Sequence, residues 1–153
     1  ARARSRTQAA TATATPTQPT AAQAGGPAPV TPALPEADGA NGRAAQIALG
    51  YLGVPYVWGG ASPSGFDCSG LASYSYAQVG KSVPHYTGAI WAAFPRVPSD
   101  QLQAGDMVFF RADLGHMGIY IGGGNYVHAP RTGDVVKISA ISERSDFVGA
   151  VRP

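Results

Sequence analysis

Three side chains of this 153-residue sequence could together cleave an amide bond: Cys68, His116 and His128. Cys68 is the single cysteine, so it is either a buried apolar side chain or a reactive thiol. A thiolate is a strong nucleophile, an imidazole can remove the thiol proton, and a third polar group can orient that imidazole. The set therefore predicts cysteine catalysis, with His116 as the base and His128 as the group that orients it.

Cys68 lies at the start of a predicted helix over residues 68–79. Asp67 is a good N-cap, and Gly80 stands where a helix commonly ends in a left-handed glycine. Free N–H groups and the helix dipole stabilise an anion at such a terminus. We expect them, with a neighbouring imidazolium, to lower the pKa of the thiol, and the same N–H groups could hold the oxyanion of a tetrahedral intermediate.

The two histidines lie on successive predicted strands that are joined by three glycines, residues 122–124. With these glycines as the loop, Gly118 faces His128, and the even-numbered residues of both strands share one side of the sheet. His116 and His128 then become diagonal neighbours, beside open space left by Gly118. The odd-numbered residues of the first strand point into the apolar side. A register shift of one residue would separate the two rings.

A zinc site is the alternative interpretation of the same three side chains. One cysteine and two histidines could supply three ligands. The sequence lacks the closely spaced pair of ligands from which such sites are usually built, so we expect no metal and no cofactor.

Other residues could line a substrate groove around the thiol. Tyr56 could pack in the core or place its hydroxyl near Cys68, and Trp58 follows it in the same turn. His85 lies between two predicted helices and is a candidate for substrate contact. Asp106 follows a glycine at a strand entrance, where we expect a turn role.

The segments that must position these residues fall into two halves. Every aromatic residue and every histidine lies within residues 41–153. Hydrophobic spacing and turn residues predict helices and then strands. The helices are expected at 41–53, 68–79 and 87–95, and the strands at 107–110, 116–121, 125–129, 135–139 and 147–151, with an extended piece and a turn at 54–60. This order predicts an α+β fold.

Residues 1–42 have a different composition, rich in Ala, Thr and Pro and without aromatic residues. Such a segment cannot bury enough apolar surface to offset its chain entropy. We expect a disordered tail that acts as a linker or as a pro-segment over the cleft, followed by a catalytic domain over residues 43–153.

Composition narrows the classes of partner. The formal net charge is +2, and no basic run with interleaved aromatics is present, so nucleic-acid binding is not expected. No segment has the length and apolarity of a membrane span, and no signal peptide is recognisable. If the protein is exported, we expect its signal to have been removed. We expect a monomer.

Five segments together resemble the NlpC/p60 family of cell-wall endopeptidases, and most of all its small mycobacterial members. The segments occur in the family's order and span most of residues 43–153: PYVWGG (55–60), GFDCSGL (65–71), AGDMVFF (104–110), GHMGIYIG (115–122) and YVHAP (126–130).

The resemblance implies a papain-like fold, with N-terminal helices packed on a central antiparallel sheet. It implies hydrolysis of peptidoglycan stem peptides, typically between D-isoglutamate and meso-diaminopimelate, by a secreted protein of the cell wall or periplasmic space. It assigns Cys68, His116 and His128 to the catalytic triad and Tyr56 to the vicinity of the thiol. Asp67 and Ser69 are implied to contact the stem.

This sequence departs from the family pattern at one place, and several alternative functions remain. Many members have Arg and Gln before the third helix, where this sequence has His85, Tyr86 and Thr87. A related acyltransferase or amidase on the same fold is one alternative. Another is a peptidoglycan-binding module without activity, and a third is a scaffold that binds other cell-wall hydrolases.

Overall fold

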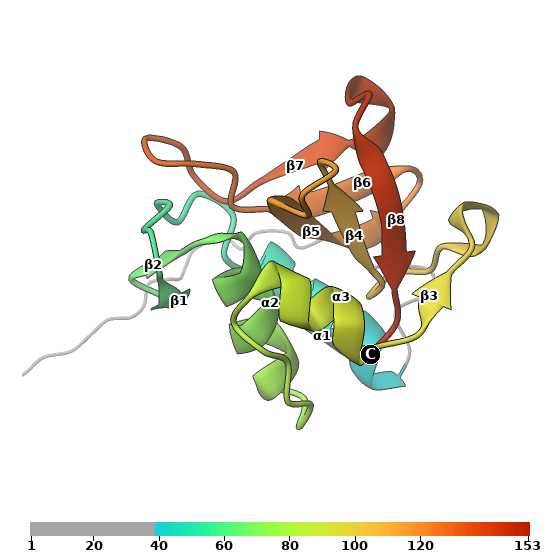
Figure 1. Cartoon of the computed structure of the whole chain (residues 1–153). Coiled ribbons are helices and arrows are strands. Elements are labelled where there is room, and N and C mark those ends of the chain that lie inside the picture. Colours follow the sequence, from blue (N-terminus) through green and yellow to red (C-terminus); the bar gives the residue numbers. More distant parts are fainter. Residues whose placement is uncertain (1–38) are drawn as a thin grey trace, which may run out of the picture. The chain divides into compact units, whose positions relative to one another are not determined.

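The computed structural model describes residues 39–153, in which helices pack on one side of an antiparallel sheet (Figure 1). Six strands form the sheet in the order β3-β8-β4-β5-β6-β7, and β1 and β2 form a separate small hairpin. This is the predicted α+β architecture. The elements are α1 (Gly39–Leu49), β1 (Ala61–Ser62), β2 (Gly65–Phe66), α2 (Cys68–Ala77), α3 (Thr87–Ala93), β3 (Arg96–Val97), η2 (Ser99–Gln101), β4 (Met107–Phe110), β5 (His116–Gly122), β6 (Asn125–His128), β7 (Lys137–Ala140), η3 (Ile141–Glu143) and β8 (Phe147–Val151).

The first helix lies closer to the N-terminus than predicted. It begins at Gly39, so Asn41 is inside the helix and its side chain donates to the Pro153 carbonyl at 3.0 Å instead of capping. It ends at Leu49 because the next three N–H groups bond three residues back, which closes tight turns before Gly53. Residues 39–42, assigned above to the tail, are therefore helical. Residues 1–38, on which the rest of the tail prediction falls, lie outside the described part of the chain.

The second helix has the predicted start and a slightly earlier end. Asp67 is its N-cap, and the Asp67 carboxylate accepts from the Gly70 N–H at 2.6 Å. The helix ends at Ala77, and Gly80 has φ +82°, with a Lys81-to-Tyr76 backbone bond closing the terminus. The helix over residues 87–93 also matches its prediction.

The central hairpin has the predicted register over most of its length. Ile119 faces Val127 and Tyr120 faces Tyr126. At the loop end Gly122 belongs to the strand and faces Asn125, and a bulge after Tyr120 absorbs the extra residue. The loop is therefore shorter than three glycines, but the sides on which the strand residues point are those predicted.

The strand predicted at 135–139 begins two residues later than expected. Val135 pairs with Pro55, and Val136 exchanges backbone hydrogen bonds with Gly53 and Val54. These bonds draw the chain toward the segment before the hairpin β1–β2, and pairing with β6 starts only at Lys137. Sequence patterning also missed the two-residue strands β1, β2 and β3, which are too short to show a period.

The sheet has an apolar cluster on each side. We call the side covered by the helices the helix face and the opposite side the outer face. Alternation along the strands separates the two sets of side chains. The helix face contains Met107, Phe109, Met117, Ile119 and Val127, packed against helix residues such as Ala48, Leu71 and Ile90. The outer-face cluster contains Val97, Val108, Phe110, Tyr120, Tyr126 and Ala150.

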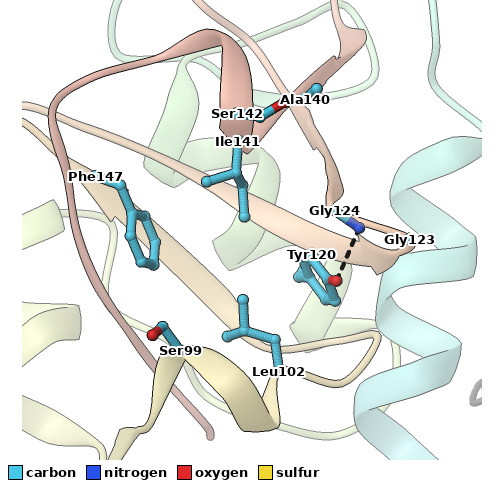
Figure 2. A pocket seen from close by; sticks show the side chains of 9 residues that line it. All are labelled: Ser99, Leu102, Tyr120, Gly123, Gly124, Ala140, Ile141, Ser142 and Phe147. Carbon is cyan, nitrogen blue, oxygen red and sulfur yellow. Dashed lines mark hydrogen bonds between the residues drawn. The ribbon is translucent and has the colours of Figure 1, made fainter.

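A hollow of about 400 Å³ lies beside the outer-face cluster (Figure 2). Leu102, Ile141 and Phe147 line it, and the Tyr120 hydroxyl accepts a hydrogen bond from the Gly124 N–H at 2.9 Å. None of the residues predicted to act in catalysis or substrate binding lines this hollow.

Candidate active site

Helix α2 presents Cys68 at its first position because the preceding turn allows very close packing. A Cβ atom at Gly70 would lie 1.8 Å from the Gly60 carbonyl oxygen, so no larger residue fits there. The Asp67 side chain links the turn to the start of α2, because its carboxylate accepts hydrogen bonds from the N–H groups of Gly70 at 2.6 Å and Gly59 at 3.0 Å. The sequence PYVWGG thus forms the support for the helix terminus that carries the thiol.

The thiol of Cys68 lies against strand β5. Backbone N–H groups of Met117, Ser69 and Cys68 itself face the sulfur. Met117 directly follows His116 at the start of β5, so the nucleophile and the proposed base come from adjoining points of α2 and the sheet. Within residues 39–153 no direct hydrogen bond joins the thiol to either imidazole. Catalytic hydrogen bonds are often long or poorly aligned in enzymes without bound substrate.

The pKa of the Cys68 thiol is raised, contrary to the expectation from its helix terminus. Burial of the sulfur is the largest cause, and the nearby Asp67 carboxylate adds to it. The backbone N–H groups act in the opposite direction but do not outweigh these two effects. The resting nucleophile is therefore a neutral thiol rather than a preformed thiolate.

The two predicted histidines are in direct contact, as the hairpin register indicated. His116 Nε2 lies 2.7 Å from His128 Nδ1, and both residues are buried. His128 Nε2 lies 2.9 Å from the Ser139 hydroxyl on β7. The arrangement is a relay of three polar groups across three adjacent strands. Ser139 was not predicted, and only the β6–β7 register could have revealed it.

The space beside the histidines is filled, which corrects the expectation of an opening at Gly118. A Cβ atom at Gly118 would lie 2.6 Å from the Tyr126 ring, 2.9 Å from the Val127 carbonyl and 3.1 Å from His128 Cβ. The missing side chain lets Tyr126 and His128 pack directly on the strand. Gly118 therefore fixes the position of the second imidazole.

Burial keeps both imidazoles neutral. Burial, and after it the positive charges of Arg144, Arg111 and Arg131, lower the pKa of His116 to about 4. Burial and the neighbouring His116 lower the pKa of His128 to about 3. A neutral imidazole can accept a proton, so His116 has the protonation state that a general base requires near neutral pH.

The thiol opens into a pocket of about 500 Å³, which we call the Cys68 pocket. It contains all five of the other predicted site residues and three residues that the sequence did not indicate. The predicted ones are Tyr56, Trp58, Asp67, Ser69 and His85; the remaining lining residues besides Cys68 and Gly59 are Tyr86, Thr87 and Gly115. Trp58 and Tyr86 are 84% and 68% exposed, so they offer two aromatic surfaces to a ligand.

Asp67 and His85 form a contact inside this pocket. His85 Nε2 lies 2.8 Å from an Asp67 carboxylate oxygen, and the Ser69 hydroxyl reaches the same oxygen at 3.4 Å. Tyr56 lies close enough that the charges of Cys68 and Asp67 raise its pKa, after the larger effect of burial. His85 thus contacts the carboxylate of the residue next to Cys68.

The described residues form neither a metal-binding cluster nor a membrane-spanning helix. Within residues 39–153 no group of three or more His, Cys, Asp or Glu side chains is placed to hold a metal ion, so Cys68 and the two histidines do not form such a cluster. Among the described helices, none has both the length and the apolar character to cross a membrane.

Comparison with known proteins assigns the family. The NlpC/P60 family matches residues 53–146, which includes the thiol, both imidazoles and the support of the α2 terminus. The chain belongs to the NlpC/P60 family.

Several relatives of this chain are peptidases by name. A probable endopeptidase of Mycobacterium tuberculosis is 40% identical over 126 residues, which is 79% of this chain and 33% of the relative. The gamma-D-glutamyl-L-lysine dipeptidyl-peptidase of Bacillus subtilis is 41% identical over 64% of this chain and 35% of its own length. The chain thus spans about a third of the length of these relatives.

Solved NlpC/P60 structures confirm the fold. The domain of the peptidoglycan hydrolase SagA has a TM-score of 0.68 and 38% identity, and the match covers 74% of this chain and 98% of that domain. The peptidoglycan hydrolase RipB of Mycobacterium tuberculosis has a TM-score of 0.67 and 30% identity, over 74% of this chain and 64% of RipB. The papain-like α+β fold and the likeness to the mycobacterial Rip proteins were both predicted from the sequence.

Proposed function

We propose that this chain is a cysteine endopeptidase that hydrolyses peptidoglycan stem peptides, with Cys68 as nucleophile, His116 as base and His128 as the residue that positions the base. One observation carries the proposal. A thiol at the N-terminus of α2 faces the Met117 amide, and the residue before Met117 holds its imidazole against a second imidazole at 2.7 Å. This is the nucleophile, base and orienting group that covalent amide hydrolysis needs.

The hydrogen bonds assign one set of tautomers to this mechanism. For His116 Nδ1 to accept the thiol proton, His116 must carry its own proton on Nε2 and donate it to His128 Nδ1. His128 then carries a proton on Nε2 and donates it to the Ser139 hydroxyl. The Ser139 hydroxyl can accept this hydrogen bond, and the contact holds the His128 ring against His116.

The chemistry proceeds in two halves. His116 removes the thiol proton as the sulfur of Cys68 attacks the amide carbonyl carbon, and the Cys68 N–H and the Tyr56 hydroxyl stabilise the oxyanion. The intermediate collapses with cleavage of the carbon–nitrogen bond, and His116 gives its proton to the departing amine. Water then attacks the thioester while His116 takes one water proton. The carboxylic acid leaves, and the thiol is regenerated.

The bond that we propose lies between D-isoglutamate and meso-diaminopimelate. The support comes from the family resemblance and from the Bacillus subtilis relative, whose name refers to a gamma-D-glutamyl bond to a diamino acid. The Cys68 pocket would hold the acyl side of this bond, with Asp67, Ser69, Trp58 and His85 in contact with the stem. Its volume of about 500 Å³ suits a short peptide.

We further propose that the protein acts outside the cytoplasm, at the cell wall, as a monomer and without a cofactor. The proposed substrate is found there, and the similar proteins SagA and RipB are peptidoglycan hydrolases by name. A role of residues 1–38, the part of the predicted tail before α1, as a linker or as an inhibitory pro-segment is part of this proposal. Equal rates for the full chain and for a variant that starts at residue 39 would remove the inhibitory role.

The test is incubation of the protein with purified muropeptides and identification of the cleaved bond by mass spectrometry. The wild type should release a fragment ending in D-isoglutamate, and Cys68→Ala should release none. Loss of His116 should lower turnover by about 10²–10⁴-fold, which is the usual contribution of a general base. Transfer of the acyl group to an added amine, in place of hydrolysis, would favour the acyltransferase alternative.

A peptidoglycan-binding module or a scaffold for another wall hydrolase is the second candidate. It predicts that muropeptides bind without cleavage and that binding does not depend on the thiol. Active wild type with an inactive Cys68→Ala variant that still binds muropeptides would exclude it as the sole function.

A further inference from the structure

A second cavity adjoins the proposed base, His116. Its volume is about 350 Å³, and we call it the arginine pocket. It is lined by Arg111, Gly115, His116, Pro130, Arg131 and Arg144. Gly115 also lines the Cys68 pocket, so the two hollows meet at the residue before the base.

The two hollows carry opposite charge. Asp67 is the only Asp, Glu, Lys or Arg among the residues that line the Cys68 pocket. The arginine pocket is lined by three guanidinium groups and by no carboxylate. A substrate that crosses both hollows would therefore meet a negative charge on its acyl side and a positive field beyond His116.

Two of the three arginines are paired with carboxylates behind the pocket. Arg144 makes a double hydrogen bond to Asp146, at 2.8 Å on both nitrogens, and its guanidinium lies 4.6 Å from the centre of the Phe110 ring. Arg111 lies 3.2 Å from Asp113, an exposed pair. Arg144 in particular is held in a structural role.

Arg131 differs from these two. Within residues 39–153 its guanidinium makes no ion pair, and it lines the arginine pocket from the loop after β6. The pocket residues and their two partners carry three positive and two negative formal charges, so one positive charge remains uncompensated. A guanidinium whose N–H donors are not engaged by a carboxylate of the protein can bind a ligand carboxylate through two parallel hydrogen bonds.

We propose that the arginine pocket binds a carboxylate on the residue that supplies the leaving amine, with Arg131 as its direct ligand. His116 must protonate the departing nitrogen, so the leaving residue has to lie beside His116. His116 itself lines the arginine pocket, so this pocket adjoins the leaving residue and can take its side chain. Where the stem continues beyond that residue, its α-carboxyl is in a peptide bond. The free anion is therefore the side-chain carboxylate of diaminopimelate.

This inference rests on the proposed function and deepens it. It predicts that the enzyme distinguishes stems with a free side-chain carboxylate from stems in which that group is amidated. The recognition would be electrostatic and hydrogen-bonded, so it should weaken with ionic strength. Arg131 would be a specificity residue that contacts substrate but takes no part in proton transfer.

The experiment compares two synthetic stem tetrapeptides that differ only at this group, a free carboxylate in one and a carboxamide in the other. The wild type should cleave the free acid with a kcat/KM about tenfold higher, the range expected for one charge-assisted contact. Arg131→Gln should raise KM for the free acid until the preference is lost, with kcat little changed. Arg131→Lys should retain part of the preference because the charge remains.

Arg43→Gln is the matched control, since Arg43 is an exposed arginine on α1 that lines neither pocket. It should keep the full preference. Equal cleavage of both peptides by the wild type, or an equal loss on both peptides in Arg131→Gln, would overturn the carboxylate site and leave the proposed function intact. Cleavage of neither peptide by the wild type would overturn both.

Discussion

His116 Nε2 and His128 Nδ1 lie 2.7 Å apart, and the outer nitrogen of His128 lies 2.9 Å from the Ser139 hydroxyl. The proposed base therefore contacts a second imidazole, which in turn contacts a hydroxyl group on a neighbouring strand. Strand pairing sets this relationship, because β5, β6 and β7 each contribute one group.

Removal of His128 should reduce turnover and leave the nucleophile in place. His128→Ala deprives His116 Nε2 of its acceptor, so the base loses its fixed tautomer and ring angle. We expect kcat to fall about 100-fold, since small errors of placement have costs of this size. The check is kcat and KM on muropeptides, with labelling of Cys68 by a thiol reagent as the control for folding.

Two milder variants, Ser139→Ala and His128→Gln, test the same positioning effect on kcat. Ser139→Ala keeps both imidazoles and should lower kcat less than His128→Ala does. His128→Gln can still accept from His116, so it should recover part of the activity. A His128→Ala enzyme with the wild-type kcat would refute the positioning role.

Alkylation of the thiol should speed up with pH well above neutrality. Burial and Asp67 raise the pKa of Cys68, and burial lowers the pKa of His116 to about 4, so the resting pair is neutral. The rate of inactivation by iodoacetamide should therefore keep rising beyond pH 8. A plateau reached below pH 7 would show a thiolate–imidazolium pair instead.

Asp67→Asn should move that alkylation profile toward lower pH. The change removes the negative charge that disfavours the thiolate, while an asparagine can still cap the helix. His85→Ala is the comparison, because it removes the Asp67 partner and keeps the carboxylate. An unshifted profile in Asp67→Asn would mean that this carboxylate does not act on the sulfur.

Stability should fall as the pH drops from about 6.5 to about 4. Both histidines have a folded-state pKa below the usual 6.5, about 4 for His116 and about 3 for His128. The unfolded chain therefore takes up protons first, which lowers the free energy of unfolding by about 1.4 kcal/mol per pH unit for each group. Above pH 6.5 both states are neutral at these positions and the effect vanishes.

Urea unfolding at a series of pH values checks this. The double variant His116→Gln, His128→Gln lacks both groups, so its stability should depend less steeply on pH than that of the wild type between pH 6.5 and 4. Parallel curves for the two proteins would show that the histidines do not titrate with depressed pKa values.

Much of this site could be predicted from the sequence because it depends on local patterns. The Asp67–Cys68 junction is a capping signal, and the shared side of His116 and His128 follows from the two-residue period of strands. The contact of His128 with Ser139 required the register of a third strand, which no local pattern gives. The raised pKa of Cys68 could not be predicted either, because burial by distant segments outweighs the helix terminus.

Gly118 shows the same limit. A glycine in a strand indicates close approach or open space, and sequence alone does not distinguish them. Here the Tyr126 ring and the Val127 carbonyl occupy the position of the missing side chain. The arginine pocket is a comparable case, since Arg111, Arg131 and Arg144 come from three loops that only the fold brings together.

Gly118→Ala should lower both stability and activity. Its Cβ would lie 2.6 Å from the Tyr126 ring and 2.9 Å from a backbone oxygen, so the β5–β6 pair must shift. Overpacking of this kind costs about 1–3 kcal/mol, and the displaced His128 should reduce kcat. Gly50→Ala is the control, because its Cβ would meet only the Ile47 carbonyl, at 3.1 Å. Melting temperature and kcat are the measurements, and an unchanged kcat in Gly118→Ala would contradict the positioning argument.

The ion pair of Asp106 and Arg152 should support the fold and not the chemistry. Asp106 is buried and accepts two hydrogen bonds from Arg152, at 2.7 and 2.9 Å, and one from the Gln103 N–H at 2.8 Å. Asp106 lines neither the Cys68 pocket nor the arginine pocket. In addition to the predicted turn role, we therefore assign it a structural role as the partner of Arg152.

Arg152→Met leaves the Asp106 carboxylate buried without its charged partner. We expect this to lower the free energy of unfolding by about 1–3 kcal/mol, the usual cost of a buried acceptor that loses its partner, because the Arg152 side chain is itself 37% exposed. A second change, Asp106→Asn, removes the unpaired charge and keeps an oxygen for the Gln103 N–H, so the double variant should regain part of the loss. Urea titrations measure the stability, and kcat per folded molecule should stay at the wild-type value throughout. A single variant as stable as the wild type would show that the pair contributes nothing to the fold.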